Sequence, residues 1–225
     1  MSFALRAEAL AKRLVGEVVV TLVQDINLEI RSGECVAITG PSGSGKSSLM
    51  YLLGLLDRPT SGRVWLHDID TTPLDEDRLA DVRLSELGFV FQSHFLLPEF
   101  SALENVLLPM RRLGRLNEAM SRRRSEELLE SLGLGEQRRK LPSQLSGGQS
   151  QRVAIARALA NDPSVILADE PTGNLDTTSS AMVQNIVRDL AHKRDRAVVV
   201  VTHDAHFAST CDRIIRIVDG RIAPE

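Results

Sequence analysis

The stretch GPSGSGKSS, residues Gly40–Ser48, decides the fold of this 225-residue chain. It follows the apolar run CVAIT at 35–39, which is typical of a short buried strand, and it leads into a predicted helix at 45–56. Its glycines bury little surface and cost backbone entropy, so packing alone does not account for them. The spacing G-x-x-x-x-G-K-[ST] between a strand and a helix is typical of a loop whose backbone N–H groups surround a phosphate.

We predict that this loop binds the phosphates of a nucleotide. Its glycines let successive N–H groups turn toward an anion, and the helix N-terminus adds partial positive charge. Lys46 can reach the β- and γ-phosphates, and the hydroxyl of Ser47 can ligate Mg²⁺. The alternative is a Gly/Ser turn that binds nothing, and the flanking strand and helix argue against it. The predicted nucleotide-binding residues are Gly40, Pro41, Ser42, Gly43, Ser44, Gly45, Lys46, Ser47 and Ser48.

The segment VILADE, residues 165–170, supplies the acidic strand end that such a loop requires. Four apolar residues predict a buried strand, and Asp169 follows where it can hold Mg²⁺ through water. Glu170 comes next, in a position from which a base could polarise a water that attacks the γ-phosphate. The alternative is a pair of solvated carboxylates.

A second anion-binding pattern is LSGGQ, which comprises Leu145, Ser146, Gly147, Gly148 and Gln149. Its small residues precede the predicted helix SQRVAIARAL and make another helix N-terminus that can face a phosphate. The phosphates of a single nucleotide need only one such site, so a second site in the same subunit requires another explanation. In a head-to-tail dimer each chain's LSGGQ would cover the other's nucleotide, which gives two shared sites. We therefore expect a homodimer that depends on the bound nucleotide.

The apolar segments predict an α/β fold with a mostly parallel sheet covered on both faces, because most of them follow a helical stretch. Two β-rich segments come first, around 4–9 and 18–30. Residues 93–146, approximately, carry no strand signal and resemble a helical insertion, with SALE at 101–104 as a capping box and Asn117 as a second N-cap. We expect a single domain over 1–225. The predicted strands are 36–39, 88–91, 165–168, 197–201 and 214–218, and the predicted helices include 45–56, 149–160 and 178–193.

Together these motifs resemble the ATP-binding-cassette (ABC) family over essentially the whole chain. The resemblance implies a P-loop NTPase core, an N-terminal antiparallel β subdomain and an inserted helical subdomain, which together form a nucleotide-binding domain. It also implies hydrolysis of ATP with Mg²⁺ as cofactor. In that family Gln92 would contact Mg²⁺ and sense the γ-phosphate, and His203 would be the switch histidine. The implied catalytic residues are Glu170, His203, Lys46 and Gln92, the Mg²⁺ residues are Ser47, Gln92 and Asp169, and the D-loop is Asn174, Leu175 and Asp176. The other histidines, His67, His94, His192 and His206, gain no such support, and we predict structural roles for them.

Two longer segments, ADEPTGNLD and FQSHFLLPEFSALENVLLPM, are similar to the subgroup that serves lipoprotein release and macrolide-type efflux in bacterial envelopes. In that subgroup the ATPase is a separate chain that dimerises beneath membrane subunits. The resemblance thus implies an ATPase that drives a separate transmembrane permease from the cytoplasmic face of the inner membrane. The alternative is a soluble ABC ATPase that acts on DNA, ribosomes or iron–sulfur assembly. The sequence carries neither the long coiled coil nor the second cassette usual in DNA-repair and translation relatives, and LSGGQ disfavours a P-loop kinase.

The composition gives no bulk attraction to nucleic acid or anionic lipid, because the net charge is −3 and the isoelectric point is about 6.0. From 93 to 144, nine Lys and Arg oppose seven Asp and Glu, so we expect a solvated helical face and no direct nucleic-acid binding. No export signal is predicted, because residues 1–14 carry charged side chains throughout and offer no uncharged apolar region. No membrane span is predicted, since the apolar runs fall far short of about 18 residues. Cys35 and Cys211 are predicted to be buried thiols in a reducing compartment, with no disulfide framework or zinc site.

The sequence departs from the family where an aromatic residue usually stacks on adenine. Aligned through LAKRL at 10–14, this chain offers Leu14 there, and its neighbours Val15 and Val18 are aliphatic too. Leu14 can cover one face of the base, but it cannot stack as a π-system. We expect weaker ATP binding and poor discrimination between ATP and GTP. The apolar segment 94–109 has two open interpretations, a partner site or the core of the helical part.

Overall fold

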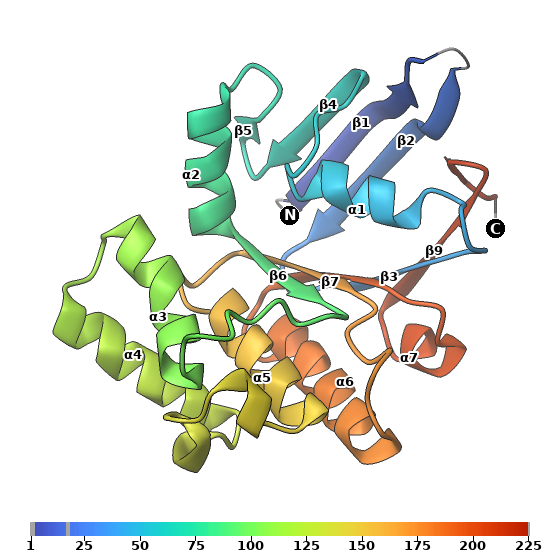
Figure 1. Cartoon of the computed structure of the whole chain (residues 1–225). Helices are drawn as coiled ribbons and strands as arrows, with labels where there is room; N and C mark the ends of the chain where they lie inside the picture. Colours follow the sequence, from blue (N-terminus) through green and yellow to red (C-terminus); the bar gives the residue numbers. More distant parts are fainter. Residues whose placement is uncertain (1–2, 17–18, 225) are drawn as a thin grey trace.

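The computed structural model describes residues 3–16 and 19–224, which form two sheets with helices between and around them (Figure 1). The first sheet is antiparallel and has the strand order β2-β1-β4-β5. The second has the order β10-β9-β3-β8-β7-β6, in which all strands but β10 run parallel. The strands are β1 (Phe3–Leu14), β2 (Val20–Arg31), β3 (Cys35–Thr39), β4 (Ser61–Leu66), β5 (Ile69–Asp70), β6 (Leu87–Phe91), β7 (Val165–Asp169), β8 (Ala197–Val201), β9 (Arg213–Val218) and β10 (Arg221–Ile222).

The α/β class and the mostly parallel sheet predicted from the sequence are confirmed. Each of the five predicted parallel strands is present, with its ends within one residue of the prediction. Strands β3, β7 and β8 are buried almost along their whole length. A strand covered on both faces is a continuous apolar run, which is why these strands are readable from the sequence.

Two hydrophobic cores lie on opposite faces of the parallel sheet. In β8, Val199 and Val201 belong to one core, and Val198 and Val200 belong to the other, as the two-residue period of a strand requires. Helix α1 (Lys46–Leu53) packs in the first core, between the two sheets (Figure 1). Helices α5 (Gly147–Ala158) and α6 (Thr177–His192) pack in the second core. The helix that follows the glycine-rich stretch and the helix that begins in LSGGQ therefore cover opposite faces of the sheet.

Helices α3 (Ala102–Leu113) and α4 (Glu118–Ser131) lie in the region predicted to lack strands, followed by the 3-10 turns η1 (Gly135–Gln137) and η2 (Pro142–Gln144). The predicted capping box is present, because Ser101 Oγ accepts the N–H of Glu104 and the Glu104 carboxylate accepts the N–H of Ser101. Asn117 caps α4 by accepting the N–H of Met120. Both predicted helix starts are confirmed.

Five elements were not predicted from the sequence: the strands β4, β5 and β10 and the helices α2 (Glu76–Glu86) and α7 (Ala205–Ser209). Helix α2 buries only Leu79 and Ser85, so its charged sequence shows no apolar period. Strand β2 begins at Val20, and the Val18 of the predicted segment lies outside the described residues. Within residues 3–16 and 19–224, no helix combines the length and apolarity needed to cross a membrane.

Candidate functional site

The glycine-rich loop (residues 40–48) joins β3 to α1 and requires glycine near both of its ends. Gly45 caps α1 with a left-handed φ of 99°, and a Cβ there would lie 2.2 Å from the carbonyl oxygen of Leu22. Gly40 has a φ of 145°, and a Cβ there would lie 2.0 Å from the carbonyl oxygen of Ile217. A side chain at either position would collide with backbone, so only glycine permits this close approach.

Polar groups of the glycine-rich loop are arranged as an anion site would need them. Lys46 Nζ donates to the carbonyl oxygens of Gly40 at 3.0 Å and Pro41 at 2.8 Å, so the ammonium group lies over the loop. The hydroxyl of Ser44 is buried and has no hydrogen-bond partner among the described residues. Because native proteins rarely bury unpaired polar groups, this hydroxyl points to a ligand of the loop.

Asp169 and Glu170 lie side by side at the carboxyl end of β7. Burial raises the pKa of Asp169, and the carboxylate of Glu170 raises it further, while Lys46 opposes the shift. Glu170 Oε1 lies 2.8 Å from Nδ1 of His203, which follows β8. The adjacent parallel strands β7 and β8 thus bring together an acid and a histidine that are far apart in the sequence.

Gln92 and Asn174 meet beside this acidic strand end. Strand β6 pairs with β7 so that Phe91 lies opposite Asp169, which puts Gln92 at the same edge of the sheet. Gln92 Nε2 donates to Asn174 Oδ1 at 3.2 Å. The sequence therefore identified residues from three separate strand ends that the fold gathers at one edge.

The signature segment (residues 145–149) forms the start of α5. Ser146 is its exposed N-cap, and Gln149 completes a capping box with it. Gly148 is buried against α6, where a Cβ would lie 2.4 Å from Ser179 Oγ. Asp176 caps α6 through the N–H of Ser179, so the start of α5 packs on the segment that contains Leu175 and Asp176. None of the hydrogen bonds among the described residues joins the signature segment to the glycine-rich loop.

Arg157 supports the loop after Gln92, a contact that was not predicted from the sequence. Its guanidinium donates to the carbonyl oxygens of Phe95 at 2.6 Å and His94 at 2.7 Å, which fixes the loop that follows Gln92. His94 and Phe95 both have left-handed φ values, 57° and 49°, so this loop has a conformation that needs outside support. Nothing in the sequence IARAL distinguishes Arg157 from an ordinary helix arginine.

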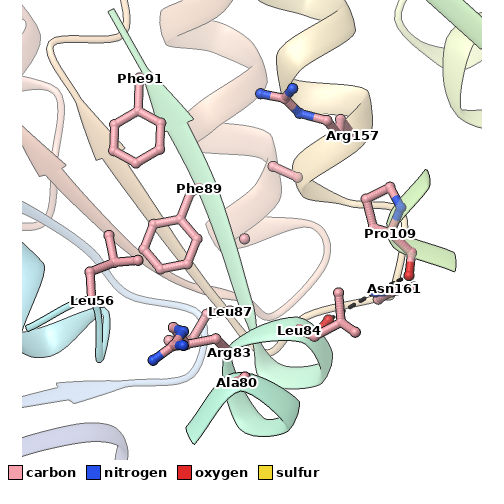
Figure 2. A pocket seen from close by; sticks show the side chains of 12 residues that line it. Leu56, Ala80, Arg83, Leu84, Leu87, Phe89, Phe91, Pro109, Arg157 and Asn161 are labelled. Carbon is pink, nitrogen blue, oxygen red and sulfur yellow. Dashed lines mark hydrogen bonds between the residues drawn. The ribbon is translucent and has the colours of Figure 1, made fainter. Parts of the chain in front are cut away.

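An apolar groove lies next to this loop, and Figure 2 shows the side chains that line it. Its volume is about 330 Å³. Phe89 and Phe91 of β6 stack with ring centroids 5.9 Å apart and form part of its wall. Ala80 and Leu84 of α2, Pro109 of α3 and Arg157 of α5 are also among the lining residues. Since Phe91 directly precedes Gln92, an occupant of the groove would lie next to the residues at the sheet edge.

Leu14 lies at the end of β1, paired with Val20 of β2. Both side chains are about half exposed, at 49% and 48%. Two residues farther along β2, the carbonyl oxygen of Leu22 closely approaches Gly45. The end of the β1–β2 hairpin that carries Leu14 therefore lies close to the start of α1 and to the glycine-rich loop.

Comparison with known proteins decides the family. The sequence pattern described as "ABC transporter" matches residues 23–173. The chain belongs to the ABC transporter family. It is 49% identical over 203 residues to the lipoprotein-releasing system ATP-binding protein LolD 1 of Chlorobium chlorochromatii, a match that covers 90% of this chain and 82% of the relative. It is 51% identical over 207 residues to the macrolide export ATP-binding/permease protein MacB of Bartonella henselae, covering 92% of this chain and 31% of that longer relative.

The fold matches that of solved cassettes of the family. The ATP-binding cassette MJ0796, solved as a dimer in a post-hydrolysis state with ADP and Pi, is 42% identical, with a TM-score of 0.90 that covers 98% of this chain and 97% of that one. The resemblance to the ABC family, its subgroup and its fold, inferred from the sequence, is confirmed. These relatives do not favour the alternative of a soluble cassette that acts on DNA, ribosomes or iron–sulfur assembly.

Proposed function

We propose that this ABC ATPase hydrolyses ATP on the glycine-rich loop, with Glu170 as the base. The observation that carries the assignment is the 2.8 Å contact between Glu170 Oε1 and His203 Nδ1, beside Asp169 and the loop. Glu170 would polarise the attacking water, and His203 would orient that carboxylate. Lys46 would move from its loop carbonyls to the β- and γ-phosphates, and Gln92 would sense the γ-phosphate next to the D-loop.

The residues at this edge fit a magnesium ion. Mg²⁺ in nucleotide sites is usually held by one or two carboxylates or hydroxyls together with the substrate's phosphates, so no larger acidic cluster is required. The hydroxyl of Ser47, Asp169 through water and the carboxamide of Gln92 supply hard oxygen donors. The raised pKa of Asp169 reflects buried negative charge beside Glu170, which a cation would offset. A bound Mg²⁺ would neutralise phosphate charge and orient the phosphates.

We propose that two chains close head to tail, so that the signature segment of one covers the ATP of the other. The exposure of Ser146 and Gly147 supports this arrangement, because that helix N-terminus is free to face an anion. The packing of α1 and α5 in cores on opposite faces of the sheet supports it as well. ATP would stabilise the closed dimer, and hydrolysis would open it.

The variant Glu170→Gln tests the role of the base. It should bind ATP with nearly normal affinity and accumulate an ATP-bound dimer in sedimentation with Mg-ATP, while phosphate release falls by a factor of about 10² or more. Glu136→Gln, on the exposed turn η1, is the matched control and should behave as the native protein. Normal phosphate release by Glu170→Gln would remove Glu170 from the mechanism.

We propose that the apolar groove receives a segment of a separate transmembrane permease, which would hold the ATPase at the cytoplasmic face of the inner membrane. Two lining residues of the groove adjoin the loop after Gln92: Phe91 directly precedes Gln92, and Arg157 donates to the loop carbonyl oxygens of His94 and Phe95, so an occupant there would respond to the state of the nucleotide. The relatives named for lipoprotein release and macrolide export support a partner of this subgroup. Within the apolar segment 94–109, Val106 and Leu107 belong to the core, while Phe95 and Leu97 are exposed, so only the second pair is free to contact a partner.

A charged side chain in the groove tests this docking. Ala80→Lys should reduce co-purification of membrane protein from detergent-solubilised membranes, while Mg-ATP binding stays intact. Asp81→Lys, the next residue of α2 and exposed, is the control that should leave co-purification unchanged. If Ala80→Lys recovers as much membrane protein as Asp81→Lys and the native chain, the permease contact lies elsewhere.

We propose, finally, that the chain is one nucleotide-binding domain with residues 93–146 as its inserted helical part. The second core supports this division, because α3, α4 and α5 pack together there with strands of the parallel sheet.

A further inference from the structure

The two cysteines of the chain lie next to each other in the fold. Cys35 is the first residue of β3, and Cys211 follows α7, yet their Sγ atoms are 3.0 Å apart. Both are free thiols in this structure. Neither lies in the glycine-rich loop, the acidic strand end or the signature segment, so the proposed ATPase mechanism does not use this pair.

The backbone around the pair is fixed from both sides. The N–H of Cys35 donates to Asp212 Oδ2 at 2.8 Å, and the N–H of Asp212 donates to the carbonyl oxygen of Cys35 at 2.9 Å. The next residues along the chain, Val36 and Arg213, are paired in the parallel ladder of β3 and β9. Disulfides need two Cα atoms within about 7 Å and converging Cβ atoms. The sulfur atoms 3.0 Å apart and the paired backbones beside them are consistent with that need.

The two thiols differ in a way that suits sequential oxidation. Cys35 is buried, with 1% exposure, and its hydrogen bond to Cys211, together with burial, raises its pKa. The same hydrogen bond lowers the pKa of Cys211, which is only partly buried at the edge of the second core. The thiolate is the form that reacts with oxidants. This difference favours Cys211 as the first thiol to react, and Cys35, with its sulfur 3.0 Å away, is within reach of the product.

We propose that Cys35 and Cys211 form a reversible intramolecular disulfide when the protein meets a hydroperoxide. The Cys211 thiolate attacks a peroxide oxygen, so that an S–O bond forms, the O–O bond breaks and the leaving hydroxide takes a proton to become water. The Cys35 sulfur then attacks the sulfenic sulfur of Cys211, the S–S bond forms, and the second oxygen leaves as water with the Cys35 proton. Two thiols and one hydrogen peroxide thus give one disulfide and two waters. A thiol reductant reverses the reaction.

The bond would link the start of β3 to the turn before β9, at the end of β3 opposite the glycine-rich loop. Since these backbones are already paired, ATP binding should be retained. The thermal midpoint of unfolding should rise, because the link closes a loop of most of the chain in the unfolded state.

The test treats the folded native chain with hydrogen peroxide and then counts thiols after denaturation. The expected result is the loss of both thiols, a peptide that joins Cys35 to Cys211 within one chain, a raised thermal midpoint, and recovery of both thiols with dithiothreitol. In Cys35→Ala the resolving thiol is gone, so dimedone should trap a sulfenic acid at Cys211. Mg-ATP binding by Cys35→Ala reports that this variant is folded.

Three outcomes would overturn the proposal. In the first, both thiols of the native chain survive the same peroxide treatment that oxidises Cys211 in Cys35→Ala. In the second, the cross-linked peptides come from two different chains. In the third, dimedone labels Cys211 in the native chain as readily as in Cys35→Ala.

Discussion

At the residue scale, the end of β7 carries two neighbouring residues whose native states cost free energy: a buried acid and a non-glycine residue with positive φ. Asp169 is an acid whose burial and neighbouring carboxylate make ionisation costly. Glu170 follows with a left-handed φ of 45°, which costs a non-glycine residue of order 1–3 kcal/mol unless the surroundings enforce it. Its N–H donates to Val201 O at 2.9 Å, so the neighbouring strand β8 holds that conformation. In this backbone conformation, the Glu170 carboxylate is in direct contact with the imidazole of His203.

Leu14 carries the residue-scale prediction about the base. An aromatic side chain stacks on a nucleic-acid base with about 1–3 kcal/mol, and about 1.4 kcal/mol corresponds to tenfold in affinity. Leu14→Tyr should therefore tighten both ATP and GTP at least several-fold, with the rate of hydrolysis at saturation little changed. Titration with a fluorescent purine nucleotide measures the change.

Val15→Tyr is the matched control for this titration. Val15 neighbours Leu14 but is 83% exposed just beyond the end of β1. Equal affinities of the native chain and Leu14→Tyr would show that Leu14 does not face the base, and equal tightening by both variants would show that position 14 is not special.

At the element scale, the start of α5 has two neighbouring glycines with different surroundings. A Cβ on Gly147 would be 3.7 Å from Leu175, an ordinary contact, and this residue is exposed. A Cβ on Gly148 would be 2.4 Å from Ser179 Oγ and 2.8 Å from its Cβ. One glycine therefore faces outward, and the other permits α5 to pack against α6.

These surroundings predict that alanine at position 148 lowers stability, whereas alanine at position 147 lowers ATP hydrolysis instead. Gly148→Ala should force α5 away from α6 and destabilise the chain by about 1–3 kcal/mol, as overpacked positions usually do. Gly147→Ala should change the free energy of unfolding by no more than about 0.5 kcal/mol, as is usual for an exposed position. It should nevertheless reduce ATP hydrolysis, because its methyl group would face the partner's nucleotide. Urea unfolding and phosphate release measure both. Equal losses of stability would contradict the assigned packing.

The elements that the sequence predicts well are those with a strong local cause. The parallel strands are apolar on both faces, and the starts of α3 and α4 carry their own caps, Ser101 and Asn117. Helix α2 could not be predicted, because it packs at the periphery and buries little. For the site, Glu170 and His203 were predicted from their places after strands, and the fold brings their side chains into contact; their roles stay predictions. Arg157 was missed, because its role rests on carbonyl oxygens of a distant loop that no residue type announces.

At the scale of the whole molecule, the central claim is that each ATP site is made from two chains. The glycine-rich loop and the signature segment begin helices that pack in different cores, on opposite faces of the parallel sheet. If the site is shared, ATP hydrolysis requires that two chains associate. The closing and opening of that dimer would then couple hydrolysis to movement of a partner.

Mixing two defective chains tests this claim most directly. Lys46→Ala damages the glycine-rich loop, and Ser146→Arg damages the signature segment, so each variant alone should release almost no phosphate from Mg-ATP. A mixed dimer contains one site built from the intact loop of one chain and the intact signature segment of the other. The account predicts that an equimolar mixture regains ATP hydrolysis, in proportion to the mixed dimers that form. An inactive mixture of folded chains that still form mixed dimers, or normal hydrolysis by Ser146→Arg alone, would contradict it.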